Sequence, residues 1–334
     1  MRILVGTDAG LNVVRWIEGE RAGRVVEKQF EGRQVYDLVV GERRLWAVVP
    51  DEGLFRSADR GETWERVVDR LDGRRIRSLA VTPRDGSRVL AGTEPAGLFL
   101  SGDDGATWRE LEEFRVMGVR ESWRDYGDRA AHVETITWDP QEPDRIYAGV
   151  EIGGAYRSDD GGASWNPINE GIFDDIHALA VDPWEPARAL AATGGGFHVS
   201  VDRGLHWRRH GNEIGELYCT ELELISRGTD VSSSLRSTLV LATADGPPST
   251  WKGLRGNAKA RLWLSRDSGE SFVELSMAGV RDKGGITALD ADPSHDGAGF
   301  FGTSSGNLYH GRLADRRWVR ILFGLPAIRS VRAY

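Results

Sequence analysis

The stretch Ser57-Ala-Asp59-Arg-Gly61-Glu-Thr63-Trp64 decides the fold, because its eight-residue pattern returns four more times along the chain. The copies share Ser, Asp, Gly and an aromatic residue at the same spacing, with Thr, Ser or His before the aromatic residue. Successive central aspartates are 44, 57, 42 and 65 residues apart, and they are Asp59, Asp103, Asp160, Asp202 and Asp267. A pattern repeated at such intervals predicts a chain built from similar supersecondary units.

The residue types of this pattern predict a tight turn. The aspartate carboxylate can accept backbone N–H groups across the turn, the glycine supplies a positive φ, and the aromatic ring packs on a sheet. We therefore interpret the five aspartates as structural, with catalysis as the less favoured alternative.

Around each copy the sequence predicts four short strands. Near the second copy, residues 76–83, 89–93, 97–100 and 108–111 alternate apolar and polar positions between Gly, Pro and Asp residues. This pattern is typical of an all-β repeat, and radial repetition protects the edges of its sheets. The first strand of the unit recurs at 35–40, 133–138, 176–181, 219–224, 286–291 and 328–333.

The two ends of the chain together supply the strands of one predicted blade. Residues 328–333 resemble a first strand with nothing after it, whereas residues 3–7 and 10–14 resemble second and third strands with no first strand before them. Pairing the ends in one blade removes exposed strand edges. Seven blades of about 48 residues each fall within the usual range for propellers. The predicted fold is therefore an all-β, seven-bladed β-propeller that forms a single domain over residues 1–334.

The pattern Ser-x-Asp-x-Gly-x-Thr-Trp resembles the Asp box, or BNR repeat, of sialidases, sortilin-type receptors, xyloglucanase-type hydrolases and photosystem II assembly factors. The chain is also similar to uncharacterised bacterial BNR proteins described as glycosyl hydrolase-like. The resemblance covers nearly the whole chain. It implies a propeller whose Asp boxes join the third and fourth strands of a blade, away from the catalytic face. It implies the fold more strongly than the function.

The charge and the composition argue against several classes of binding partner and of site. The chain has 51 acidic and 43 basic residues, a net charge of -8, which argues against binding to nucleic acid or to an anionic membrane. Cys219 is the only cysteine, so the chain forms neither an intrachain disulfide nor a thiolate zinc cluster. The sequence shows neither the apolar run of a signal peptide nor an 18-residue apolar window. We therefore expect a cytoplasmic protein.

Two inserts interrupt the repeat, at residues 112–131 and 245–260. In propeller topology both connections emerge on the face opposite the Asp boxes, which makes that face the predicted binding face. Their aromatic residues suit stacking on a sugar, a ring or a peptide, and we take Trp123, Tyr126 and Trp251 as ligand-binding candidates. The alternative is a solvated lid held by aromatic plugs.

Polar residues also recur where the first strands begin, at the predicted mouth of the central channel. The aligned positions are Tyr36, Arg77, Glu134, His177, Thr220, Thr287 and Arg329. Nearby positions on the same strands add Arg75, His132, Asp175 and Tyr218, and the ends of the second strands add Glu94 and Glu151. Converging polar groups of this kind indicate a site. The alternative is that they pair with each other.

Two chemistries fit these residues. Glycoside hydrolysis needs two carboxylates about 5–10 Å apart. Histidines with carboxylates could instead hold a divalent zinc, iron or manganese ion, with His132 and His177 as candidate ligands. The catalytic candidates are Glu94, Glu134, Glu151, Asp175 and His177. The ligand-binding candidates on the strands are Arg75, Arg77, Tyr218 and Arg329.

Three hypotheses follow from the sequence. The first is a propeller that binds a polar small molecule or glycan at the channel mouth, with glycosidase-type activity as an option. The second is a metal-dependent hydrolase or lyase that uses the His/carboxylate cluster. The third is a non-enzymatic scaffold with a protein partner. The residues leave open whether the protein is an enzyme.

Overall fold

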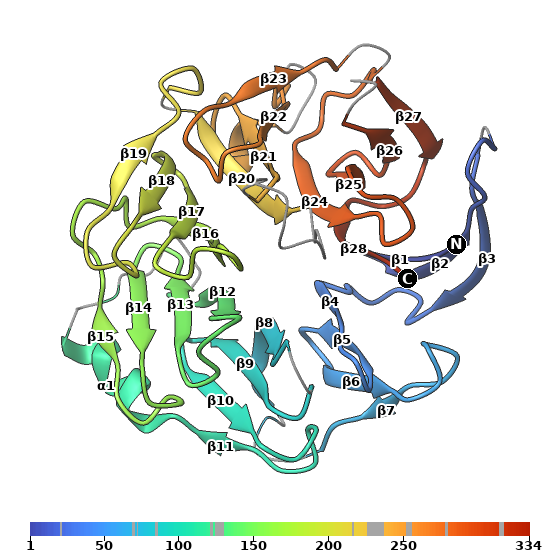
Figure 1. Cartoon of the computed structure of the whole chain (residues 1–334). Helices are drawn as coiled ribbons and strands as arrows, with labels where there is room; N and C mark the ends of the chain where they lie inside the picture. Colours follow the sequence, from blue (N-terminus) through green and yellow to red (C-terminus); the bar gives the residue numbers. More distant parts are fainter. Residues whose placement is uncertain are drawn as a thin grey trace. The chain divides into compact units, whose positions relative to one another are not determined.

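The structure is a computed structural model of the chain. It describes residues 1–20, 22–68, 71, 73–83, 86–120, 123, 130–215, 217–225, 237–251, 256–277, 280–313 and 317–334. In these residues seven antiparallel sheets of four strands each account for strands β1 to β28 (Figure 1). The fold is a seven-bladed β-propeller, which confirms the prediction from the repeat. None of the described helices is long and apolar enough to span a membrane.

The chain divides into two compact units. Unit 1 comprises Met1–Val35, Gly194–Phe197 and His210–Tyr334. Its first sheet has the order β28 (Ile328–Ala333), β1 (Arg2–Thr7), β2 (Gly10–Arg15), β3 (Arg24–Gln29). The second contains β20 (Tyr218–Leu224), β21 (Leu239–Ala244), β22 (Arg261–Ser265) and β23 (Val273–Leu275). The third contains β24 (Ile286–Ala291), β25 (Ala298–Thr303), β26 (Leu308–Arg312) and β27 (Arg317–Leu322).

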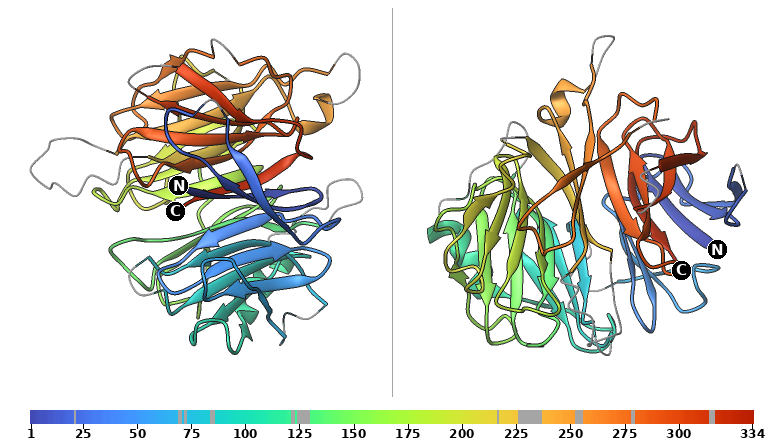
Figure 2. Two further views of the ribbon diagram at one scale, coloured as in Figure 1. Left: turned by 90° about the vertical axis from the view of Figure 1, so that its right-hand side faces the viewer. Right: turned by 45° about the horizontal axis from the view of Figure 1, so that its top comes forward.

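The first sheet of unit 1 is built from both ends of the chain. β1 pairs antiparallel with β28, so that Leu4 lies opposite Arg332 and Val5 opposite Val331. Figure 2 shows these terminal strands side by side in two further views. Val5 and Val331 are fully buried, because each strand also packs its side chains on a neighbouring sheet. The predicted blade made from the two termini is therefore confirmed.

Unit 2 comprises Tyr36–Thr193 and His198–Arg209. Its first sheet contains β4 (Asp37–Val40), β5 (Leu45–Val49), β6 (Gly53–Ser57) and β7 (Glu65–Arg66). The second contains β8 (Arg75–Val81), β9 (Val89–Glu94), β10 (Leu98–Ser101) and β11 (Arg109–Glu110). The third contains β12 (Val133–Trp138), β13 (Ile146–Val150), β14 (Gly154–Ser158) and β15 (Asn166–Pro167). Most of a fourth sheet also lies here, with β16 (Ile176–Val181), β17 (Ala189–Thr193), β18 (Gly196–Ser200) and β19 (Arg208–His210).

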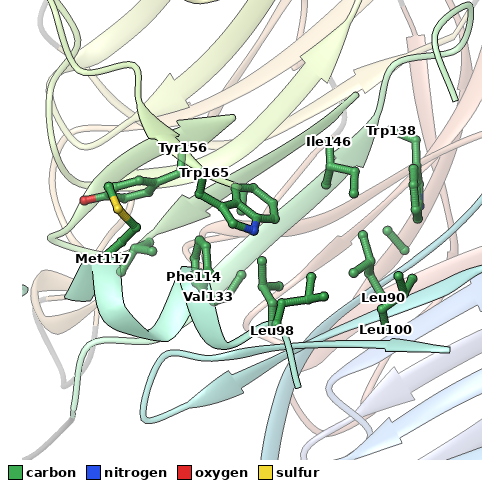
Figure 3. Close-up of a cluster of buried hydrophobic side chains, with 14 of the residues drawn as sticks. Leu90, Leu98, Leu100, Phe114, Met117, Val133, Trp138, Ile146, Tyr156 and Trp165 are labelled. Carbon is green, nitrogen blue, oxygen red and sulfur yellow. The ribbon is translucent and has the colours of Figure 1, made fainter. Parts of the chain in front are cut away.

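The first insert contributes to the core between the second and third sheets of unit 2. Its first nine residues form α1 (Glu112–Arg120). Phe114 is fully buried and makes an edge contact with Trp165, with ring centroids 4.9 Å apart. Figure 3 shows Phe114 and Met117 beside Tyr156 and Trp165 in this cluster. The start of this insert therefore serves packing, whereas the sequence suggested a binding role for the insert as a whole. In the second insert the structure describes a short 3₁₀ helix, η1 (Pro248–Thr250).

Asp103 illustrates the contacts of the five repeated turns. Its Oδ1 accepts the backbone N–H of Thr107 at 2.8 Å, and its Oδ2 accepts the Thr107 hydroxyl at 2.6 Å. The backbone N–H of Gly105, whose φ is 79°, donates to Ser101 Oγ at 2.8 Å. The hydrogen bonds from Thr107 lower the pKa of Asp103 to about 2. Four further carboxylates accept the backbone N–H four residues later in the same way, namely Asp59, Asp160, Asp202 and Asp267.

Candidate functional site

A cluster of charged side chains lies where the inner strands of unit 2 begin. In the second sheet Arg75 on β8 lies opposite Glu94 at the end of β9. In the third sheet the backbone N–H of Glu151, which follows β13, donates to the His132 carbonyl at 3.0 Å. Because antiparallel neighbours run in opposite directions, the start of each inner strand and the end of the second strand share one edge. β12 in turn packs against β8 and β16, so the cluster draws on several sheets.

His132 is the centre of this cluster. Its Nε2 lies 2.7 Å from Glu151 Oε2 and 3.0 Å from Glu134 Oε2. Its Nδ1 lies 3.3 Å from the backbone carbonyl of Ala130. The imidazole is only 3% exposed, whereas the side chains of Glu134 and Glu151 are 21% and 20% exposed. The cluster therefore has a buried imidazole and a partly solvent-accessible carboxylate surface.

Arg77 lies between Glu134 and a third carboxylate, that of Glu94. Its Nη2 donates to the Tyr36 hydroxyl at 3.0 Å and lies 3.6 Å from Glu134 Oε2. The Tyr36 hydroxyl in turn donates to Glu134 Oε1 at 2.9 Å. Arg77 Nε lies 3.7 Å from Glu94 Oε2, and neither of these buried atoms has a hydrogen-bond partner within the described part of the chain. We refer to Tyr36, Arg77, Glu94, His132, Glu134 and Glu151 as the inner-strand cluster.

Burial and charge pairing set the protonation states of this cluster. Burial disfavours the charged form of His132, but hydrogen bonds to Glu134 and Glu151 outweigh it and raise the His132 pKa to about 9. Burial likewise raises the pKa of Glu134, but His132, Arg77 and Tyr36 together lower it to about 2. Burial, followed by the Glu134 charge, raises the Tyr36 pKa well above its usual value. At neutral pH the cluster thus contains an imidazolium and an ionised Glu134.

Three other candidates lie on neighbouring strands of unit 2. The Arg75 side chain is 47% exposed and its Nε lies 3.7 Å from Glu94 Oε2. Asp175 precedes β16, and its Oδ1 lies 3.3 Å from His177 Nε2 on that strand. Among the described residues, the three side chains whose metal-ligand atoms converge are His132, Glu134 and Glu151. The structure thus pairs His177, the second candidate metal ligand, with Asp175 instead.

The aromatic candidates of the inserts have structural contacts. Trp123 Nε1 donates to the Tyr156 hydroxyl at 2.6 Å, and its ring centroid lies 5.1 Å from that of Phe114. Trp251, in unit 1, donates through Nε1 to the Gly246 carbonyl at 2.8 Å. Its ring covers Gly285, where an added Cβ would approach to 2.2 Å. These contacts match the aromatic plugs that the sequence left as an alternative. Tyr126 lies outside the described residues.

The two remaining ligand-binding candidates also belong to unit 1. Tyr218 begins β20 and lies opposite Ala244 of β21. Arg329 on β28 forms two hydrogen bonds with the Asp8 carboxylate, at 2.7 and 2.8 Å. Gln34 donates to the same carboxylate at 2.6 Å. Asp8 and Arg329 therefore form a second polar group at the start of an inner strand.

A hollow of about 460 Å³ lies elsewhere in unit 2, beside the second and third repeated turns. Its lining includes Arg88, Thr107, Trp108, Asp144 and Asp160. Arg88 Nη1 donates to Asp144 at 2.8 Å. Arg88 is not among the residues expected at a site from the repeat. The sequence nevertheless marks its position, because arginine stands directly before the second strand of four successive sheets, at Arg44, Arg88, Arg145 and Arg188.

No protein-family model matches the chain. It is 33% identical over 133 residues to a xyloglucanase of Paenibacillus sp, a match that covers 34% of this chain and 13% of the relative. It is 29% identical over 274 residues to the oligoxyloglucan-reducing end-specific xyloglucanase of Emericella nidulans, covering 68% of this chain and 31% of the relative. It is 25% identical over 143 residues to the human VPS10 domain-containing receptor SorCS1, covering 42% of this chain and 10% of the relative. Each match spans less than a third of the relative's own length.

Solved structures share the fold at low identity. The GH74 enzyme of Niastella koreensis superposes with a TM-score of 0.69 at 14% identity, covering 96% of this chain and 47% of that chain. The GH74 xyloglucanase of Xanthomonas campestris superposes with a TM-score of 0.65 at 18% identity, covering 87% of this chain and 45% of that chain. A structure of YCF48 with a bound D1 peptide superposes with a TM-score of 0.59 at 13% identity, covering 89% of this chain and 83% of that chain. The chain is thus similar to xyloglucanases and to a sortilin-type receptor, as its repeated turn predicts.

Proposed function

We propose that this protein binds a polar, carbohydrate-like ligand at the inner-strand cluster of unit 2. The observation that carries the proposal is the group of partly exposed charged side chains on one edge of these sheets. Glu134 and Glu151 each expose about a fifth of their side chains, and Arg75 exposes 47%. The sequence similarity to xyloglucanases supports a sugar as the ligand class.

Carboxylates and guanidinium groups suit a ligand rich in hydroxyl groups. Glu134 and Glu151 accept hydrogen bonds from sugar hydroxyls, whereas Arg75 donates hydrogen bonds to sugar oxygens. Hydrogen bonds that involve a charged group contribute about 1.5–3 kcal/mol each, more than neutral ones. Asp175 and His177, at the start of the next inner strand, extend the same polar edge.

The geometry favours binding over hydrolysis at this place. A glycosidase holds the scissile bond between its two carboxyl groups, and one of them must be a protonated acid. Here the His132 imidazole touches both carboxylates, at 2.7 and 3.0 Å, and takes the position between them. The pKa of Glu134, lowered to about 2, keeps that residue ionised at neutral pH. Glu134 is therefore a hydrogen-bond acceptor and not a general acid.

Calorimetric titration with xyloglucan oligosaccharides tests the proposal. We expect the wild-type protein to bind, and Glu151→Gln, Asp175→Asn and Arg75→Gln to weaken binding by about tenfold each, since a lost charged hydrogen bond is worth at least 1.4 kcal/mol. Glu65→Gln is the matched control, because Glu65 is a carboxylate on the outer strand β7 and is 65% exposed. Equal binding by all four variants would place the ligand elsewhere.

The same samples separate binding from catalysis. We expect no new reducing ends after prolonged incubation of the wild-type protein with the oligosaccharides. Hydrolysis that Glu134→Gln or Glu94→Gln abolishes would establish the glycosidase alternative. If no oligosaccharide binds, the proposal fails, and the scaffold hypothesis becomes the one to test.

A further inference from the structure

We propose that His132, Glu134 and Glu151 form a binding site for one divalent transition-metal ion of the zinc or manganese(II) class. This inference does not depend on a saccharide ligand. It concerns the buried side of the inner-strand cluster, whereas the proposed glycan contacts its partly exposed side.

The three ligand atoms already have the spacing of a metal's coordination sphere. His132 Nε2 lies 2.7 Å from Glu151 Oε2 and 3.0 Å from Glu134 Oε2, and all three atoms lie within 4.8 Å of one another. Ligands bonded at about 2.0–2.2 Å to one ion lie about 3 Å apart in an octahedral arrangement and about 3.4 Å apart in a tetrahedral one, so the carboxylates need to move outward by less than about 1 Å. One imidazole nitrogen with two carboxylate oxygens is a donor set that first-row divalent ions accept.

The second ring nitrogen of His132 has the partner typical of a metal ligand. Its Nδ1 lies 3.3 Å from the backbone carbonyl of Ala130. Metal-ligating histidines almost always donate their other N–H to such an acceptor, which fixes the tautomer and the ring orientation. When a metal ion replaces the Nε2 proton, the Nδ1 proton can stay donated to Ala130, and the Nε2 lone pair is then directed at the space beside the two carboxylates.

A single proton on His132 Nε2 can point at only one of its two carboxylate neighbours at a time. His132 Nε2 has two carboxylate oxygens and one donor, Arg77 Nη2 at 3.1 Å, as neighbours. If Nε2 carries a proton, that proton serves one carboxylate well and faces the Arg77 donor. If Nε2 carries none, its lone pair faces two oxygen acceptors. A cation at this point attracts the lone pair and both carboxylates at once.

The charges around the site favour a cation. With neutral His132, the three carboxylates of Glu94, Glu134 and Glu151 face the two guanidinium groups of Arg75 and Arg77, so one negative charge is uncompensated. A cation is attracted to this charge, and metal ligands are bound in the deprotonated form.

Glu94 provides an alternative partner for Arg77 when the ion enters. Arg77 Nε and Glu94 Oε2 are buried and 3.7 Å apart, and neither makes a hydrogen bond within the described part of the chain. The side chains of Arg77 and Glu94 are only 5% and 10% exposed. A small movement of the guanidinium away from His132 gives it a direct hydrogen bond to Glu94. We therefore assign Glu94 as a positioning residue for this site.

Titration calorimetry with zinc chloride tests the site in the whole 334-residue chain, after chelator treatment and without saccharide. We expect one ion per chain. His132→Gln and Glu151→Gln should weaken zinc binding by at least about 100-fold, and Glu94→Gln by about tenfold, since lost supporting partners cost 10–100-fold in affinity. His206→Gln is the matched control. His206 is an exposed histidine between two carboxylates, 2.6 Å from Asp202 and 3.6 Å from Glu170, and we expect its loss to leave the affinity unchanged.

X-ray absorption at the zinc edge of the loaded wild-type protein keeps the proposal testable if a variant does not fold. We expect one imidazole nitrogen with oxygen ligands. The proposal is overturned if the wild-type protein takes up no zinc, if His206→Gln abolishes the uptake, or if the spectrum shows sulfur or two imidazoles.

Discussion

The inner-strand cluster and the repeated turns use carboxylates in opposite ways. In the turns, each aspartate is satisfied within its own eight-residue pattern, as when Asp103 binds Ser101 and Thr107. In the cluster, Tyr36 reaches Glu134 across 98 residues of sequence, and Arg77 reaches His132 across 55. Both settings lower a carboxyl pKa, to about 2 for Asp103 and for Glu134. The comparison shows that similar electrostatics can arise from a local motif or only from the assembled fold.

A mutation should lower the free energy of unfolding more in the inner-strand cluster than in the repeated turns. Three of the turn aspartates, Asp59, Asp103 and Asp160, are exposed, and Asp202 and Asp267 are partly exposed, so water can replace a lost partner. The cluster contains side chains such as Arg77 and His132, which are 5% and 3% exposed. Removing one partner of a buried ion pair leaves an uncompensated charge, which is much more costly than losing a solvated contact.

The largest effect is expected for Arg77→Met. Removing the buried guanidinium leaves the half-exposed Arg75 as the cation beside Glu94, takes a cation away from Glu134 and deprives Tyr36 of its donor. We expect a loss of about 3–5 kcal/mol in the free energy of unfolding, measured by urea denaturation. Arg75→Met is the control, because Arg75 is half-exposed and faces the same Glu94. Equal losses for the two variants would remove the distinction between buried and exposed charges.

A smaller effect is expected for Asp103→Ala. It removes the acceptor for the Thr107 backbone N–H and hydroxyl, in the manner of a lost helix cap, at a cost of about 1–2 kcal/mol. Asp103→Asn keeps a side-chain oxygen and should cost less in the same denaturation experiment. Oligosaccharide binding should persist in both folded variants. Loss of binding at unchanged stability would contradict the structural role of the turn.

This contrast also explains how much the sequence could predict. The repeat predicts the seven blades, and the incomplete first and last units predict the pairing of β1 with β28, because both are local patterns. The repeat also brings Tyr36, Arg77, His132, Glu134 and Glu151 to one edge and leaves open that these groups pair with each other. It does not show which pairs form, such as Tyr36 with Glu134 and Arg77 with His132, because those contacts depend on the packing of neighbouring sheets. Nor does it show that Trp123 donates to Tyr156, because the packing of α1 is not encoded in the repeat.

Acid titration should sharpen the comparison further. The folded pKa of Asp103 and of Asp202 is about 2, below the value of about 3.9 for an unfolded aspartate. Between these values the unfolded chain binds more protons, so stability increases with pH. The ionised turn aspartates therefore make their full contribution to the free energy of unfolding above about pH 4. This contribution is lost as the pH falls toward about 2. Asp103→Asn should flatten this dependence in denaturation curves recorded from pH 6 to 2. An unchanged slope would mean that the carboxylate is not preferentially ionised in the folded state.

The smallest effect is expected for Glu65→Gln. Glu65 pairs with Arg56 at 3.0 Å, but its side chain is 65% exposed. Exposed ion pairs contribute little, because water and salt screen them. We expect no change in the urea midpoint beyond experimental error. A clear decrease would show that exposure alone does not rank these carboxylates.

A crystal structure of the wild-type protein soaked with a xyloglucan oligosaccharide tests the central claim most directly. That claim is that the ligand binds at the inner-strand cluster and not beside the repeated turns. The account predicts sugar density against Glu134, Glu151 and Arg75. Density confined to the hollow lined by Arg88, Trp108 and Asp160 would contradict it.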